Sequence, residues 1–174
     1  MKLNTTFRTI LVFSLSLILL FSCKKDNNPP QPDFAVAFNL NGARDTFALG
    51  YCWIQPNGSD PTNTDFMVVA RSADNSQQFW LTIQVKGDFV PGVYTSGNSN
   101  YTVIADYIMN IGETSERDYT IDHALDNPAS SFTVTISSIK NNVIKGTFIG
   151  NYLYDRNYDE MINLTDGSFT VKKK

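Results

Sequence analysis

Cysteine and histidine are scarce in this chain, whose 174 residues include two cysteines and one histidine. So few of these residues exclude a disulfide-stabilised scaffold and a zinc site built from several Cys and His ligands. An excess of positive charge is also missing, because the formal net charge is −3 and the pI is about 5.0. Nucleic-acid-binding proteins normally carry a basic surface, so we expect no nucleic-acid partner.

Local catalytic signatures are missing as well. The single histidine, His123, lies in an acidic stretch, and the sequence contains no Gly-x-Ser-x-Gly nucleophile motif. A Ser-His-Asp triad needs a base, an orienting carboxylate and an activated serine. We therefore expect no catalytic residues and a protein that is not an enzyme. A hydrolase with two carboxylates far apart in the sequence remains an alternative, because such pairs leave no local motif.

Long hydrophobic runs are limited to one segment near the N-terminus. Residues 10–21 are apolar apart from two serines, and Lys2 and Arg8 precede them. This run is shorter than the roughly 20 apolar residues that a transmembrane helix needs. Residues 1–22 are therefore predicted to be a secretory signal peptide.

A cysteine directly follows this segment. The sequence Leu20-Phe21-Ser22-Cys23 resembles the lipobox of bacterial lipoproteins, with a branched apolar residue three positions before the cysteine and a small residue just before it. The resemblance implies that the signal is cleaved before Cys23 and that Cys23 carries acyl chains such as palmitate. More than one acyl chain makes membrane anchoring stable. We expect a lipid-anchored protein of the bacterial cell envelope, at the outer membrane, with its periplasmic or surface orientation left open.

The segment after the lipidated cysteine is polar. Residues 23–32 contain three prolines and no apolar side chain beyond Cys23, which is typical of a tether. Nine residues of polyproline II helix would reach about 28 Å. Cleavage would remove two of the 14 basic side chains and none of the 17 acidic ones, so the mature chain is more acidic than the full one.

Residues 33–174 read as a single domain of β-strands. Apolar and polar residues alternate with the period of two that is typical of strands, and pairs such as Asn41-Gly42 and Asn141-Asn142 predict tight turns. We predict an all-β antiparallel β-sandwich of about eight to ten strands. A closed antiparallel lipocalin-like barrel is the alternative, because both architectures bury alternate residues. Gly146 and Gly150 within one strand indicate a bend, a bulge or close packing.

Two glycine-containing segments close this domain. Gly146-Thr147-Phe148-Ile149-Gly150, and a later strand containing Asp166-Gly167-Ser168-Phe169, resemble the closing hairpin of a family of small cell-envelope lipoproteins of Bacteroidota. The lipobox and the turn at Pro91-Gly92-Val93-Tyr94 add to this resemblance. The family has no catalytic signature to carry over, so the resemblance implies an envelope lipoprotein without naming its ligand.

One aromatic residue points to a binding function. Trp80 stands on the polar side of its strand, and exposed aromatic rings stack well on sugar rings because their surface is apolar yet compatible with a polar rim. We predict a glycan-binding platform at Trp80, with Tyr101 or Tyr107; the alternative is that Trp80 is covered. The protein is thus expected to be a binding or surface-structural module with a glycan or protein ligand. A carrier of an apolar small ligand inside a β-barrel is the second hypothesis.

A weak calcium signature lies near the C-terminus. Asp155, Asn157, Asp159 and Asp166 echo the spacing of oxygen ligands in a calcium-binding loop. Glu160 stands where the sharp turn of such a loop needs glycine, and the last ligand is not the usual glutamate. A solvated hairpin loop is the alternative, and we expect no cofactor other than calcium.

Overall fold

The computed structural model describes residues 34–121, 130–155 and 157–174, which form eleven β-strands and no helix. The strands are β1 (Ala35–Leu40), β2 (Ala43–Phe47), β3 (Leu49–Pro56), β4 (Asn63–Arg71), β5 (Gln77–Lys86), β6 (Gly92–Thr95), β7 (Tyr101–Met109), β8 (Arg117–Ile121), β9 (Ser131–Lys140), β10 (Val143–Asp155) and β11 (Glu160–Lys172). Within these residues no helix has the length and apolarity needed to cross a membrane. The all-β antiparallel prediction is confirmed, and short strands such as β2 and β6 bring the number to eleven.

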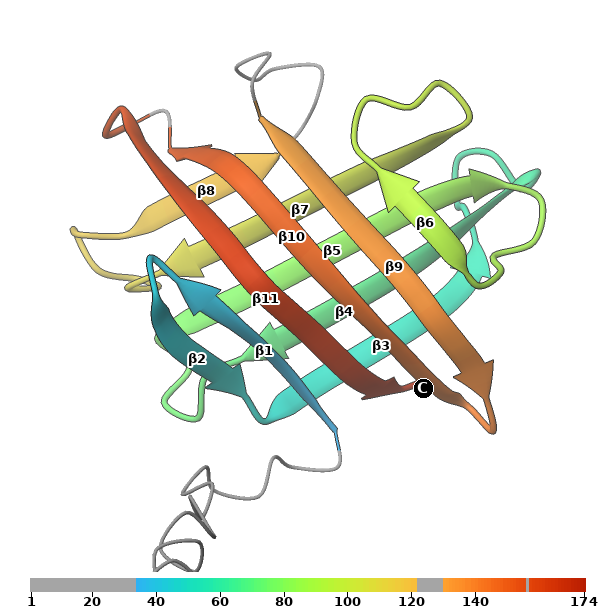
Figure 1. Ribbon diagram of the computed structural model, residues 1–174, viewed down its shortest axis with the longest axis horizontal. Helices are drawn as coiled ribbons and strands as arrows, with labels where there is room; N and C mark the ends of the chain where they lie inside the picture. Colours follow the sequence, from blue (N-terminus) through green and yellow to red (C-terminus); the bar gives the residue numbers. More distant parts are fainter. Residues whose placement is uncertain (1–33, 122–129, 156) are drawn as a thin grey trace, which may run out of the picture. The chain divides into compact units, whose positions relative to one another are not determined.

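The strands form two layers that share one long strand. The hydrogen-bonded order is β2-β1-β11-β10-β8-β7-β5-β4-β3, and β9 and then β6 branch from β10. We call β6, β9, β10, β11, β1 and β2 the first layer, and β8, β7, β5, β4 and β3 the second layer. Strand β10 pairs with β9 along residues 143–151 and with β8 at Tyr154, so it belongs to both. The strands of the two layers cross steeply (Figure 1), as in orthogonally packed sheets.

The layers also meet along a second line, which we call the seam. There Cys52 of β3 forms a parallel bridge with Lys173, which follows β11. The backbone N–H of Lys174 donates to the Cys52 carbonyl oxygen at 3.0 Å. The layers are therefore joined at β10–β8 and at the seam, which gives an open, barrel-like sandwich.

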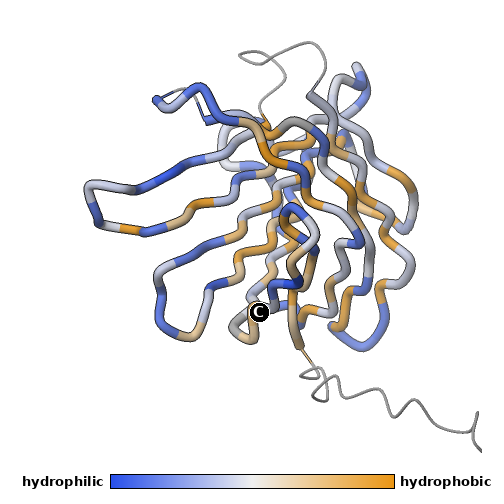
Figure 2. The backbone as a smooth tube through the Cα atoms, turned by 60° about the vertical axis from the view of Figure 1, so that its left-hand side comes forward, coloured by the Kyte–Doolittle hydropathy of each residue, from blue (hydrophilic) through white to orange (hydrophobic). Residues whose placement is uncertain are grey.

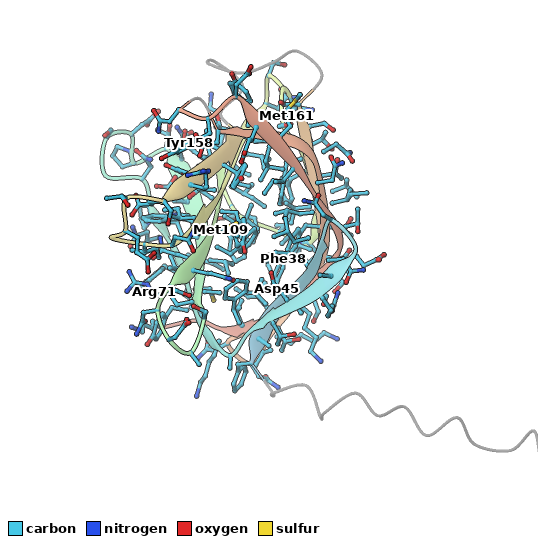
Figure 3. The ribbon with its side chains drawn as sticks, turned by 90° about the vertical axis from the view of Figure 1, so that its left-hand side faces the viewer. Phe38, Asp45, Arg71, Met109, Tyr158 and Met161 are labelled. Carbon is cyan, nitrogen blue, oxygen red and sulfur yellow. The ribbon has the colours of Figure 1, made fainter. Side chains whose placement is uncertain are left out.

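Aromatic side chains fill the space between the layers. Phe38 lies in this space (Figure 3) and packs against Phe47, Phe79, Tyr107 and Phe148 with ring centroids 5.4–6.0 Å apart. Hydrophobic stretches follow the strands while hydrophilic stretches mark the loops (Figure 2). The core is thus built from alternate residues of nearly every strand, as the period of two predicts.

Glycines inside the first layer make room for these rings. A Cβ atom on Gly146 would lie 2.6 Å from the Thr135 carbonyl oxygen and would overlap the Phe169 ring. The register of β9 against β10 shifts between Lys145 and Gly146. Both features confirm the prediction that this glycine marks an irregular, closely packed point of the strand.

Candidate functional site

The outward side of the second layer carries an unusual number of large apolar side chains. Their neighbours along each strand, such as Cys52, Phe79 and Leu81, are fully buried between the layers, so these side chains must point away from the core. We call this group the aromatic face, and its members are Tyr51, Trp53, Met67, Val69, Trp80 and Ile104.

Strand register arranges the aromatic face in two rows. In the first row Tyr51 pairs with Val69, which pairs with Trp80. In the second row Trp53 pairs with Met67 on the adjacent strand. Neighbouring strands lie about 4.8 Å apart, so the Cα atoms of Tyr51 and Trp80 are separated by about 10 Å. Because the β3–β4, β4–β5 and β5–β7 pairings show no register shift, the rings stand on a regular surface.

The rings of the aromatic face have defined neighbours. The indole N–H of Trp80 donates to Oγ1 of Thr82 at 3.0 Å, two residues along the same side of β5. The rings of Tyr51 and Trp53 have centroids 6.3 Å apart. The ammonium group of Lys174 lies 3.9 Å from the Tyr51 ring centroid and 5.6 Å from that of Trp53. These contacts limit ring motion, which lowers the entropy cost of binding.

A row of polar side chains borders the aromatic face. The carboxylate of Asp65 accepts hydrogen bonds from the amides of Asn57, at 2.9 and 3.1 Å, and Gln84, at 3.0 Å. Beyond Gln84, the structure has a cleft of about 260 Å³, lined by residues that include Lys86, Asn98, Asn100 and Tyr101. Amides, a carboxylate and hydroxyls thus follow the aromatic rings along β5.

Only part of the predicted glycan platform is assembled. Trp80 lies on the outward side and is half-buried, whereas Tyr107 is fully buried between the layers. The Tyr107 hydroxyl donates to Gln77 at 3.2 Å and lies 3.5 Å from Asp45. Burial is the main cause that raises its pKa, and Asp45 adds to it. The prediction that Tyr107 belongs to the glycan platform is therefore wrong.

Tyr101 lies neither beside Trp80 nor in the core. Its hydroxyl accepts a hydrogen bond from the Thr95 backbone N–H at 3.1 Å, and its ring packs edge-on against Tyr94. Tyr101 pairs with Val85, five residues along β5 from Trp80, or about 16 Å away at the strand rise. Tyr101 lines the polar cleft and does not stack beside Trp80.

Sequence reasoning missed Tyr51 and Trp53. Phe47 of β2 faces the core. If the alternation continued unbroken from Phe47, the odd-numbered residues 51 and 53 would face the core as well. The strand breaks at Ala48, where the chain passes from the first layer to the second. After this break the even-numbered Cys52 faces inward, so the two aromatic residues face outward. No local sequence signal marks such a change of side.

The calcium hypothesis fails on geometry. Asp155 is fully buried, and its carboxylate accepts hydrogen bonds from the backbone N–H groups of Asp118 and Asn157 at 2.9 and 2.8 Å. Asp159 accepts from the Tyr154 hydroxyl at 2.8 Å. Asp166 lies six residues into β11 from Glu160, the partner of Asp155, which is about 20 Å along the strand.

These carboxylates therefore fix the β10–β11 hairpin instead of forming one ligand shell. Among the described residues, no three His, Cys, Asp or Glu side chains gather as metal ligands.

A second cleft, of about 400 Å³, lies between β2 and the β4–β5 turn. Asp45 and Asp74 both line it, and Asp74 accepts hydrogen bonds from the hydroxyls of Ser72, at 2.6 Å, and Ser76, at 2.8 Å. The Ser72 hydroxyl is the main cause that lowers the pKa of Asp74 to about 2. The Asp74 carboxylate thus stabilises the β4–β5 turn through these hydrogen bonds.

Cys23 and His123 lie outside the described residues. Cys52 is buried and free, as predicted for a small apolar residue in a strand, and burial raises the pKa of its thiol to about 11. A thiol with so high a pKa is a poor nucleophile at neutral pH.

Comparison of this chain with protein-family models, with curated proteins and with solved structures finds no match.

Proposed function

We propose that this protein is a lipid-anchored binding module of the bacterial cell envelope that captures glycans on its aromatic face. The observation that carries the proposal is the outward placement of Tyr51, Trp53 and Trp80 on one regular sheet surface. Rings held in this way offer flat apolar area, and the polar row beside them offers hydrogen-bond partners for sugar hydroxyls. The proposal assigns no catalytic residue.

The dimensions of the site favour an extended glycan over a single sugar. The site runs from Trp80 to Lys86 on β5, which is about 20 Å at the strand rise, and spans about 10 Å from Tyr51 to Trp80 across the strands. A site of this length contacts several sugar rings at once. Each contact can be weak, because linked contacts raise the overall affinity.

The interior of the sandwich supports a surface site over a carrier function. The rings of Phe79, Phe132 and Phe148 contact one another with centroids 4.9–6.5 Å apart between the layers. Packed rings leave little room for an apolar ligand, since protein interiors reach crystal-like density.

Glycan binding is tested by measuring retention of the protein on an array of extended polysaccharides. We expect Trp80→Ala to weaken binding about fivefold, because one stacked ring contributes about 1 kcal/mol. Trp80→Phe keeps a ring and should retain most of the affinity. Thermal melting of each variant separates loss of binding from loss of folding.

The matched control is Ile149→Ala. Ile149 is an exposed apolar residue (44%) on the first layer, away from the aromatic face, so its removal should leave retention unchanged. Equal retention of Trp80→Ala and the parent protein, or no retention of the parent on any polysaccharide, would overturn glycan capture.

The anchor is tested separately by labelling cells with radioactive palmitate. The parent chain should carry the label and the Cys23→Ala variant should not, because the acyl chains attach to this residue. Unlabelled parent protein would contradict the lipid anchor while leaving the glycan site open to test. Protease treatment of intact cells then distinguishes surface from periplasmic exposure.

A further inference from the structure

Positive charge gathers at one end of the domain. We call this end the basic pole, and its members are Lys140, Lys145, Lys172, Lys173 and Lys174. No acidic residue occurs in residues 131–154 or 167–174, which supply the strands of this end. The single ion pair found among the described residues joins Arg117 and Glu160, so none of these lysines is paired with a described carboxylate.

Strand register brings the lysines together. Val143 pairs with Lys140 on one side and with Lys172 on the other, which separates the two lysines by about two strand spacings, or 10 Å. The backbone N–H of Lys173 donates to the carbonyl oxygen of Asn142 at 2.7 Å and holds the tail against the β9–β10 turn. Lysines at about one Debye length repel one another, and a negatively charged partner would relieve this repulsion.

The opposite end of the same two strands is acidic. Strand β10 ends at Asp155 and β11 begins at Glu160, beside the β7–β8 loop with Glu113 and Glu116. The Tyr158 hydroxyl donates to the Thr114 carbonyl oxygen at 3.3 Å and links this loop to the hairpin. The two ends lie diagonally opposite in Figure 1, so the domain carries opposite charges at its two ends although its net charge is negative.

The chain enters the domain at the basic pole. Ala35, the first residue of β1, pairs with Thr170, two residues before Lys172. Figure 1 shows the start of β1 and the C-terminus at the same end of the domain. Lys172, Lys173 and Lys174 lie there, and lysine side chains suit the interface between water and lipid headgroups because their stems are apolar and their ends are charged.

We propose that the basic pole binds the anionic lipid headgroups of the membrane that holds the anchor, and so orients the domain with its acidic end away from that membrane. This inference rests on the proposed lipid anchor. A single lipid attachment restrains position but not orientation, and each lysine near an anionic surface changes partitioning by roughly fivefold. A soluble acidic polymer is the competing occupant.

The test uses the full lipidated chain in vesicles of one part phosphatidylglycerol to three parts phosphatidylcholine. A fluorophore is attached at Ser138→Cys, which pairs with Lys145 at the basic pole, or at Thr114→Cys in the β7–β8 loop. Quenching by lipids that carry a quencher then reports how close each end lies to the bilayer. Cys52 stays unlabelled because it is buried.

We expect the label at position 138 to be quenched several-fold more than the label at 114. This difference should disappear in vesicles of phosphatidylcholine alone, at high salt, and when Lys140, Lys145, Lys172 and Lys173 are all replaced by Gln. Arg44→Gln, which changes an exposed cation of β2 outside both the basic pole and the aromatic face, should change nothing.

Three results would overturn the inference. The first is equal quenching of the two labels on anionic vesicles, and the second is a difference that survives replacement of the four lysines. The third is loss of the difference on adding a soluble acidic polysaccharide while the protein stays anchored, which would assign the basic pole to such polymers.

Failure of the anchor gives a separate result, because the protein would then not float with phosphatidylcholine vesicles. In that case salt-sensitive flotation with the anionic vesicles alone still supports the basic pole, and its absence rejects it.

Discussion

The two layers of the sandwich are built in different ways. In the second layer, the pairings of β3, β4, β5, β7 and β8 run without a register shift. In the first layer, the pairings of β11 with β1 and of β10 with β9 and β11 all contain shifts. Three buried glycines, Gly146, Gly150 and Gly167, face phenylalanine rings in the first layer, whereas Gly50 of the second has only ordinary contact with Val171.

This difference separates two tasks. Bulges and glycines increase the twist and bend of strands, which lets β10 and β11 reach β8 at one end and β9 and β3 at the other. The strands of the second layer do not have to bend in this way. They form a regular surface on which the aromatic side chains lie in rows. Curvature in one layer thus closes the fold, while the other layer keeps the regular surface on which we propose that glycans bind.

The largest expected change in stability comes from a substitution in the closely packed first layer. Gly146→Ala should lower the free energy of unfolding by about 3 kcal/mol, because its Cβ would meet the Thr135 carbonyl oxygen and the Phe169 ring. Chemical denaturation measures this change. Gly58→Ala is the control, since nothing lies within 4 Å of a Cβ at that position, and it should change stability by about 0.5 kcal/mol or less. Similar effects of the two variants would remove the contrast between the layers.

The second largest expected effect is a pH dependence of the free energy of unfolding that comes from Cys52 at the seam. Burial raises the pKa of Cys52 from 9.0 to about 11, so between these pH values the unfolded thiol ionises while the folded thiol keeps its proton. The folded state then binds more protons, and the free energy of unfolding should fall as the pH rises, by about 2 kcal/mol from this group.

The measurement for the seam is chemical denaturation at a series of alkaline pH values. Burial likewise raises the pKa of Tyr119 from 10.0 to about 12, with Glu160 adding to the shift, so the decline in stability continues up to the higher of these pH values. Cys52→Ala should flatten the first part of the decline, and an unchanged slope would show that the thiol is not shielded at the seam.

The smallest expected effect lies in the second layer. Tyr107→Phe removes a buried hydroxyl that donates to Gln77 and lies close to Asp45, which should cost about 1 kcal/mol. Thermal or chemical denaturation measures it. A loss larger than that of Gly146→Ala would reverse the ranking and place the more sensitive packing in the regular layer.

Much of the fold follows from local sequence. The turn at Asn41-Gly42 has positive φ at both residues (48° and 89°), as does Asn141-Asn142 (52° and 62°), in agreement with the tight turns that these pairs predict. Alternation also predicts the inward side of β9 as far as Ile136 and of β10 as far as Gly150. Beyond a register shift of β10 against β11 the buried side changes, and Leu153 and Asp155 face inward instead.

The candidate site was harder to predict, because it depends on contacts between distant segments. In β7 both sides carry apolar residues, so the sequence alone does not say that Tyr107 faces the core while Ile104 faces outward. The neighbours of Trp80 follow from the register of β3, β4 and β5. The separation of Asp155 from Asp166 depends on where the β10–β11 turn begins, and the strand break at Ala48 decides the side on which Tyr51 lies.

The pairing of β1 with β11 has a consequence for the order of folding. The first strand of the domain finds its partner only in the last one, where Ala35 meets Thr170, so the first layer cannot be completed until nearly the whole domain is available. Folds dominated by such distant pairings form slowly. For a chain exported across a membrane, as we propose, slow completion is an advantage, because it keeps the chain unfolded and able to cross until translocation has ended.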